Sequence, residues 1–298
     1  MILELKANSL DDGPGIRTVV FFKGCPLSCL WCHNPESKRT EAEISFAAND
    51  CIDCGTCREI CHQQALSKIN PFYIDRSKCN LCFDCIDSCP SQALTRVGKT
   101  MSTDEITDLV LKDKPFYDVS GGGVTLSGGE PTMFADYCGE LLRKIKSHNI
   151  STLVETCGQF KFETFERLIL PYTDIIYYDL KIFPTDLHRK YCGANNEQIL
   201  ENFTRLQKLS LTGRFSIKPR TPLIPGITDT ENNLKLIADF LKQLGVNRIQ
   251  LMQFNPLWYE KEQKLGLTTQ TVFKNQRWQD REKMACCENI FKEREIEV

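Results

Sequence analysis

Three cysteines near the N-terminus stand at a spacing that suits a metal or cluster with one open position. Cys25, Cys29 and Cys32 follow one another as C-x3-C-x2-C, directly after the apolar run at residues 18–22. Four cysteine ligands close a metal or cluster completely, whereas three leave one position for a further ligand. A structural zinc loop or three buried free thiols is the simpler alternative. The three cysteines therefore predict a metal or cluster site that is open to a further ligand.

Two further groups of four cysteines lie between residues 46 and 98. Each has the spacing C-x2-C-x2-C-x3-C, and an Ala-Leu pair follows each group four residues on, so this stretch is an internal repeat. Bacterial two-cluster ferredoxins have this run, and the fourth cysteine of each run ligates the other cluster. Zinc ribbons, the alternative, use two C-x2-C pairs instead. Carried over by position, one [4Fe–4S] cluster takes Cys51, Cys54, Cys57 and Cys89, and the other takes Cys79, Cys82, Cys85 and Cys61.

Composition narrows the class of protein. The chain has 298 residues, 16 cysteines and a net charge of −2. The charge balance gives no basic excess that would point to nucleic acid or to an anionic membrane. No secretory signal and no apolar run near 18 residues is evident, so we expect a cytoplasmic protein with no membrane span. Cysteines that stay reduced and lie in clusters indicate metal or iron–sulfur binding rather than disulfides.

Outside residues 46–98, apolar strands alternate with amphipathic helices. With that insert of roughly 53 residues removed, about 31 residues remain per strand–helix unit, as in a (β/α)8 barrel. We therefore expect a partial (β/α)6 barrel from residues 1–45 and 99–298, with an inserted two-cluster ferredoxin domain at 46–98. A doubly wound open sheet is the alternative, although no G-x-G-x-x-G opens a helix. The predicted strands are residues 16–22, 124–126, 152–154, 174–178, 215–218 and 246–252.

Several predicted helices carry their own start signals. Ser102 with Glu105 and Thr228 with Glu231 read as capping boxes, which predict helices from these positions to about residues 112 and 244. Other apolar spacings predict helices over residues 134–147 and 162–170, helical stretches to about 211, and a last helix over 281–292.

Polar side chains follow each predicted strand. In parallel βα folds the carboxyl ends of the strands meet at one face, where active sites lie. Singly, each residue would read as a solvated loop position, but together they predict one shared polar pocket. After the three-cysteine loop, the residues are Gly128-Gly129-Glu130, Glu155, Asp179 with Lys181, Arg220, and Asn255.

Three stretches resemble the activating enzymes of glycyl radical enzymes, a group within the radical S-adenosylmethionine (SAM) superfamily typified by pyruvate formate-lyase activase. They read D-D-G-P-G-I-R-T-V-V-F-F-K-G-C, G-G-G-V-T-L-S-G-G-E-P and Y-D-L-K, and the resemblance spans about residues 9–255. The two-quartet insert is similar to that of the larger subgroup. The resemblance implies that Cys25, Cys29 and Cys32 hold a [4Fe–4S] cluster whose fourth iron binds SAM.

The resemblance also assigns roles around SAM. Trp31 and His33 of the loop are expected beside the cofactor, the tryptophan against adenine. Gly128, Gly129 and Glu130 are expected to receive the methionine amino group. Glu155-Thr156 stands where the family has an acidic residue followed by threonine, and it is expected close to SAM. Further contacts are expected from the D-L-K segment, Asp179, Leu180 and Lys181, and from Arg220 near the nucleoside.

One position departs from the family pattern. Many relatives carry P-Y-H after the last strand, whereas this chain has Gln253-Phe254-Asn255-Pro256. Asn255 can donate and accept hydrogen bonds but carries no charge. The resemblance therefore predicts that Asn255 contacts SAM through hydrogen bonds and without the charge that a histidine could carry.

Function follows from the resemblance as an expectation. A one-electron reduction would split SAM into methionine and a 5′-deoxyadenosyl radical, which takes hydrogen from a glycine of a partner glycyl radical enzyme. A flavodoxin- or ferredoxin-type protein would supply the electron. Two alternatives are a radical SAM enzyme that modifies a peptide or small molecule directly, and an electron carrier. No catalytic role is assigned to Cys138, Cys157, Cys192, Cys286 and Cys287.

Overall fold

The computed structural model describes residues 1–267 and 278–298 and is built around one seven-stranded sheet. The first strand pairs antiparallel with the second, and the remaining neighbours are parallel. From the second strand on, spatial order follows chain order, whereas a doubly wound sheet reverses its order at a switch point. The strands are β1 Ile2–Ser9, β2 Arg17–Phe22, β5 Gly123–Gly128, β6 Ser151–Thr156, β7 Ile175–Asp179, β8 Ser216–Leu223 and β9 Gln250–Gln253.

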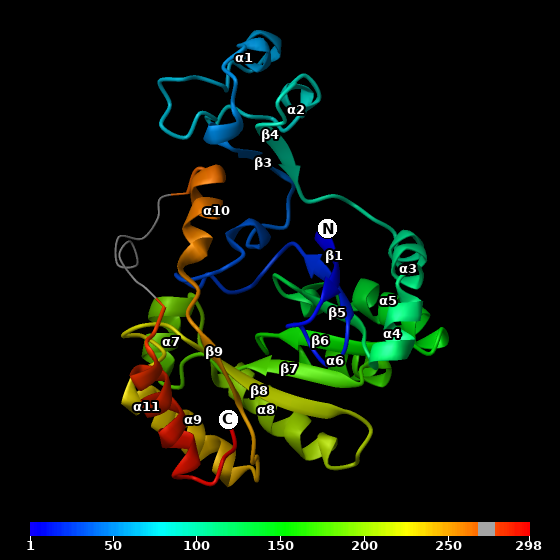
Figure 1. Ribbon diagram of the computed structural model, residues 1–298, viewed down its shortest axis with the longest axis vertical. Helices are drawn as coiled ribbons and strands as arrows, with labels where there is room; N and C mark the ends of the chain where they lie inside the picture. The colour runs from blue at the N-terminus through cyan, green and yellow to red at the C-terminus, as the bar shows by residue number, and fades with distance from the viewer. Residues whose placement is uncertain (268–277) are drawn as a thin grey trace.

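Helices follow the parallel strands and cover the outer face of the sheet (Figure 1). Their buried side chains form one large core with alternate strand residues such as Val20, Leu126 and Ile176. Because side chains alternate between faces along a strand, the intervening residues point to the inner face. The longer helices are α3 Thr103–Leu111, α4 Lys114–Ser120, α5 Ala135–Ser147, α6 Phe162–Leu168, α7 Thr185–Cys192, α8 Glu197–Ser210, α9 Glu231–Gln243 and α11 Arg281–Lys292.

A smaller lobe lies at one end of the molecule (Figure 1). It contains the antiparallel pair β3 Glu43–Phe46 and β4 Leu94–Val97 and the short helices α1 Thr56–Ile60 and α2 Asp84–Asp87. Its own buried cluster includes Ile44, Tyr73 and Leu94. The helix α10, Tyr259–Lys264, comes from the far end of the chain and lies between this lobe and the sheet (Figure 1).

Local signals account for many element boundaries, but several predictions differ from the structure. The strand predicted over residues 246–252 is β9, Gln250–Gln253, and the strand predicted over 215–218 is β8, Ser216–Leu223, while α4 was not predicted. Ser102 and Glu105 form the predicted capping box of α3, and α11 spans the predicted residues. The capping box at Thr228 is wrong: Thr230 is the N-cap of α9, and its side chain accepts from Asn233 N. Thr228 Oγ1 instead accepts from Ile224 N over 2.6 Å, which fixes the turn before the helix. The sequence reasoning did not predict β1.

In the described parts of the chain, no helix combines the length and the apolar character that crossing a bilayer requires.

Candidate functional site

One cavity of about 720 Å³ lies at the carboxyl ends of the parallel strands. Most residues expected around SAM line it, and they come from the cysteine loop and from the ends of β5 to β9. Leu180 and Glu130 do not line it, because both are buried behind its wall. The expected residues on the wall are Cys25, Cys29, Trp31, Cys32, His33, Gly128, Gly129, Glu155, Thr156, Asp179, Lys181, Arg220 and Asn255.

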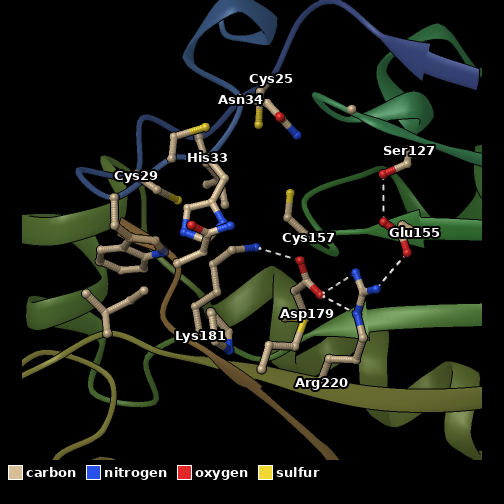
Figure 2. Close-up of a pocket in the computed structure, with 18 of the residues that line it drawn as sticks. Cys25, Cys29, His33, Asn34, Ser127, Glu155, Cys157, Asp179, Lys181 and Arg220 are labelled. Atoms are coloured by element: carbon tan, nitrogen blue, oxygen red, sulfur yellow. Dashed lines mark hydrogen bonds and ion pairs between the residues drawn. The ribbon is translucent and has the colours of Figure 1, made fainter. Parts of the chain in front are cut away.

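A chain of charged groups crosses the floor of this cavity from β5 to β8 (Figure 2). Arg220 Nη1 donates to Glu155 Oε1 over 2.6 Å, and Arg220 Nε donates to Asp179 Oδ1 over 3.0 Å. Ser127 Oγ donates to the other oxygen of Glu155, and Lys181 Nζ donates to Asp179 Oδ2 over 3.1 Å. Strand register explains the arrangement, because Asp179 and Arg220 are direct partners across β7 and β8.

The charges in this chain hold one another ionised. Burial acts to raise the pKa of Asp179, but the charges of Arg220 and Lys181 overcome it, and the pKa is lowered. Burial acts to lower the pKa of Lys181, yet the negative groups around it, Asp179 first, leave the pKa well above its usual value. The pKa of Arg220 is raised in the same way, against its desolvation, by Asp179 and Glu155. Lys181 therefore presents a permanent cation to the cavity.

The cysteine loop is held from three sides. Lys23, fully buried, precedes the loop and pairs with Glu43 Oε2 over 2.7 Å while also donating to Glu36 O. The carboxyl end of α7 accepts from the loop backbone: Ser28 N donates to Cys192 O over 2.8 Å, and Leu30 N donates to Tyr191 O over 3.0 Å. These contacts fix the loop without using its thiols.

The glycine pair after β5 closes the third side. Glu130 N donates to Gly24 O over 2.7 Å, and Gly129 N donates to Phe22 O over 2.9 Å. A Cβ at Gly129 would lie 2.1 Å from Gly24 O, so only glycine lets the two backbones approach this closely. The Gly-Gly element thus braces the cysteine loop as well as lining the cavity.

Glu130 occupies a different position from the one expected for an amino-group acceptor. Its carboxylate has no exposed surface and already accepts from Thr132 Oγ1, from Thr156 Oγ1 and, over 2.7 Å, from Cys157 N. These bonds tie the end of β5 to the end of β6. In this structure Glu130 shapes the cavity wall from behind, and the backbone of Gly128 and Gly129 faces the cavity.

The three thiols share one wall, and two of them contact further thiols. A hydrogen bond from Cys157 is the largest influence on Cys25 and lowers its pKa, and Figure 2 shows these two side chains facing each other. Cys29 is hydrogen-bonded to Cys192, and this bond together with burial raises the pKa of Cys29. Burial raises the pKa of Cys32 to about 12.

The donor set suits an iron–sulfur cluster. Cys25, Cys29 and Cys32 all line the cavity, and thiolates are the ligands of such clusters. Across residues 1–267 and 278–298, no three His, Cys, Asp or Glu side chains gather closely enough to hold one metal ion.

An apolar layer lies behind the cysteine loop. Trp31, only 4% exposed, packs in a buried cluster with Ile224, Phe254 and Trp258. His33 stands edge-on to Phe254, and burial lowers its pKa, so it is neutral at physiological pH. This side of the cavity is therefore apolar, whereas the side formed by the strand ends is charged.

Two smaller cavities lie in the lobe that contains β3 and β4. Each is lined by four cysteines, three from one quartet and the last from the other. The first cavity is lined by Cys51, Cys54, Cys57 and Cys89, and the second by Cys61, Cys79, Cys82 and Cys85.

Sequence reasoning missed several residues of the main cavity. Asp11 and Asp12 line it from the turn before β2, and Trp278 lines it from the segment before α11. Ser127 was identifiable in principle from strand alternation. It lies two residues from Thr125, so both side chains point to the inner face of β5, toward the cavity. The position of Trp278 depends on tertiary packing and has no local signal.

Comparison with known proteins agrees with this geometry. A family profile described as "Radical SAM superfamily" matches residues 19–241. The chain is 39% identical over 259 residues to the isethionate sulfite-lyase activating enzyme of Oleidesulfovibrio alaskensis, covering 85% of this chain and 82% of that protein. It is 37% identical over 276 residues to the (2S)-3-sulfopropanediol dehydratase activating enzyme of Klebsiella oxytoca, covering 90% and 86%.

Among solved structures, a radical SAM methyltransferase from Sphaerobacter thermophilus aligns with a TM-score of 0.55 at 14% identity, covering 100% of this chain and 75% of that one. This likeness concerns the fold alone. The family profile and the relatives show that the chain belongs to the radical SAM superfamily, among the activating enzymes of glycyl radical enzymes.

Proposed function

We propose that the cavity at the strand ends is where this activating enzyme binds and splits SAM. The observation that carries the proposal is the meeting, in one cavity, of the three-thiol loop with charged residues from the ends of three strands, β6, β7 and β8. Cys25, Cys29 and Cys32 would hold a [4Fe–4S] cluster, which would supply the electron that splits SAM into methionine and a 5′-deoxyadenosyl radical. That radical would take a hydrogen atom from the glycine of the partner.

The chain's own residues orient SAM between a polar and an apolar wall. Lys181 is the cation available to the methionine carboxylate, and Asp179 holds its ammonium group in place. Backbone groups of Gly128 and Gly129 are the partners for the amino group, since the Glu130 carboxylate is occupied. Trp31, which lines the cavity and is 4% exposed, is the aromatic contact for adenine.

Further contacts rest on the remaining polar residues of the cavity. Glu155, Thr156 and Arg220 form its floor toward the nucleoside, and Asn255 takes the position after β9. His33, neutral and half-buried, is a hydrogen-bonding contact rather than a charge. The apolar side of the cavity limits the entry of solvent and confines the reacting groups to the cavity.

The partner is a protein, and the relatives suggest its class. The two relatives above are named for activating a sulfite-lyase and a dehydratase. We infer that this chain activates a glycyl radical enzyme of the lyase or dehydratase type. Direct modification of a peptide or small molecule has no such support among these relatives, and an electron carrier would not need the SAM cavity.

The lobe is proposed to be a ferredoxin-like insert with two [4Fe–4S] clusters. Its support is the partition of eight cysteines into two cavities with the fourth cysteine of each quartet exchanged. On this reading residues 1–45 and 99–298 form a partial (β/α)6 barrel and residues 46–98 the insert. Cys54 and Cys82 are exposed, one in each set, which suits electron entry from a flavodoxin- or ferredoxin-type donor in the cytoplasm.

The proposal is tested with protein reconstituted with iron and sulfide under anaerobic conditions. With SAM, dithionite and a glycyl radical enzyme of the lyase or dehydratase type from the same organism, we expect 5′-deoxyadenosine and an organic radical signal. Cys29→Ala should stop SAM cleavage and leave the two insert clusters, so that about eight of about twelve irons remain. A Cys29→Ala protein that still made 5′-deoxyadenosine would refute the assignment of the cluster loop. Cys286→Ala, which alters an exposed thiol outside all three cavities, is the matched control.

A further inference from the structure

Trp278 has an unusual position at the rim of the SAM cavity. Its side chain lines the cavity and is 50% exposed. The other tryptophan on the wall, Trp31, is only 4% exposed and packs within the apolar layer. Among the described wall residues, Trp278 is the large apolar side chain that remains exposed. Trp278 therefore offers exposed side-chain surface to a second molecule.

The segment that carries Trp278 is tied to the sheet. The side-chain amide of Gln279 donates to Leu223 O at the end of β8 and accepts from Phe254 N just after β9 over 2.9 Å. Gln253 Nε2 donates back to Gln279 O over 2.8 Å. These bonds join the last two strands of the sheet to this segment. Trp278 is thus held beside β9, the strand at the end of the sheet.

The next residues anchor the segment a second time. Asp280 caps α11 by accepting from Lys283 N, and Lys283 Nζ donates to Asp229 O over 3.0 Å. The helix α11 packs along α9 on the outside of the sheet (Figure 1). A tryptophan presented from such a fixed backbone loses little conformational entropy when it is covered.

We propose that Trp278 is a recognition residue for the glycine-bearing segment of the protein substrate. The activating reaction requires a glycine Cα to reach the cavity, so a polypeptide must cross its rim. SAM is held at the cysteine loop, Gly128–Gly129 and Lys181, whereas Trp278 lies on the side of β9, where the sheet ends. A tryptophan combines a large apolar surface with one N–H donor, which suits a backbone that presents both apolar and carbonyl groups.

The inference rests on the activating function, and the assays separate the two. One assay measures the dissociation constant for the purified glycyl radical enzyme that this chain activates in the assay above. A second measures 5′-deoxyadenosine formed without that protein, and a third measures glycyl radical formation against its concentration. Wild-type protein that binds this partner yet forms no radical would contradict the proposed function, while the binding comparison would still test Trp278.

Trp278→Ala should raise the dissociation constant roughly tenfold or more, as expected for the loss of a central aromatic anchor. The half-saturating partner concentration for radical formation should rise by the same factor, and Trp278→Phe should recover most of the affinity. Leu211→Ala, at a side chain 79% exposed and remote from the cavity wall, is the matched control and should bind as wild type. Unchanged binding by Trp278→Ala would overturn the inference. An equal loss of radical formation and partner-free SAM cleavage would also overturn it, because Trp278 would then act on SAM.

Discussion

Asp179 and Arg220 are register partners on neighbouring strands, and the guanidinium joins this aspartate to Glu155 one strand further on. Arg220 therefore bridges two carboxylates that face the cavity, and Lys181 pairs with Asp179 as well. The side chains of Arg220, Glu155 and Asp179 are 9%, 13% and 19% exposed. Because these side chains are largely removed from water, the loss of Arg220 would leave the Glu155 carboxylate without its ion-pair partner and only weakly screened from Asp179.

Arg220→Met should destabilise the protein by about 3 kcal/mol, the cost of breaking a buried ion pair. The measurement is urea unfolding of the cluster-free protein. Lys235→Met is the matched control, because Lys235 pairs with Glu231 at the surface, where the two side chains are 45% and 72% exposed. That control should change the free energy of unfolding by less than about 1 kcal/mol. Equal effects of the two substitutions would contradict the role of Arg220.

The same network predicts how stability depends on pH. The pKa of Asp179 is lowered in the folded protein, so its contribution to stability is complete above the unfolded value of about 3.9. That contribution is lost as the pH falls from about 3.9 through the lowered pKa. Asp179→Asn should therefore reduce the free energy of unfolding at pH 7 and show a shallower fall below pH about 4. Parallel pH profiles for the variant and the wild type would contradict this prediction.

Gly129 is the contact through which the end of β5 supports the cysteine loop. Gly129→Ala places a Cβ 2.1 Å from Gly24 O and 2.9 Å from Ser37 O, and both obstacles are backbone atoms. The loop must move, which should cost about 3 kcal/mol and reduce the iron bound at Cys25, Cys29 and Cys32. Gly213→Ala is the control: its φ is +76°, but nothing lies within 4 Å of the new Cβ. It should cost about 1 kcal/mol and bind iron as wild type does. Normal iron content in Gly129→Ala would argue against this bracing contact.

Patterns with a short-range cause were predictable from sequence. The capping box of α3 and the extent of α11 follow from side chains within one turn of each end. The shared pocket followed from strand alternation and parallel pairing, which bring the ends of β5 to β8 together. The sequence favoured Thr228 as the cap of α9, because Glu231 follows it at the spacing of a capping box. The structure gives that role to Thr230, because Thr228 Oγ1 accepts from Ile224 N in the preceding turn.

Other features depend on long-range packing. Glu130 reads as a ligand-binding carboxylate, but Thr156 and Cys157, about 26 residues away, occupy it with hydrogen bonds. Likewise β1 has a polar, exposed middle and gains its order from pairing with β2. Trp278 reaches the cavity only because Gln279 binds the ends of two strands. None of these partners is implied by local sequence.

The exchange of cysteines between the two lobe cavities predicts an unusual pattern of iron loss. Cys61 and Cys82 come from different quartets but line one cavity, whereas Cys57 and Cys61 share a quartet but line different cavities. The double variant Cys61→Ala/Cys82→Ala should therefore lose one cluster, about four irons, because both substitutions strike the same site. Cys57→Ala/Cys61→Ala should lose two clusters, about eight irons. Iron and sulfide analysis after anaerobic reconstitution measures both.

If each quartet held its own cluster, the two results would be reversed, because Cys57 and Cys61 would then belong to one site. In either case SAM should still bind, since the cluster loop at Cys25 lies outside the lobe.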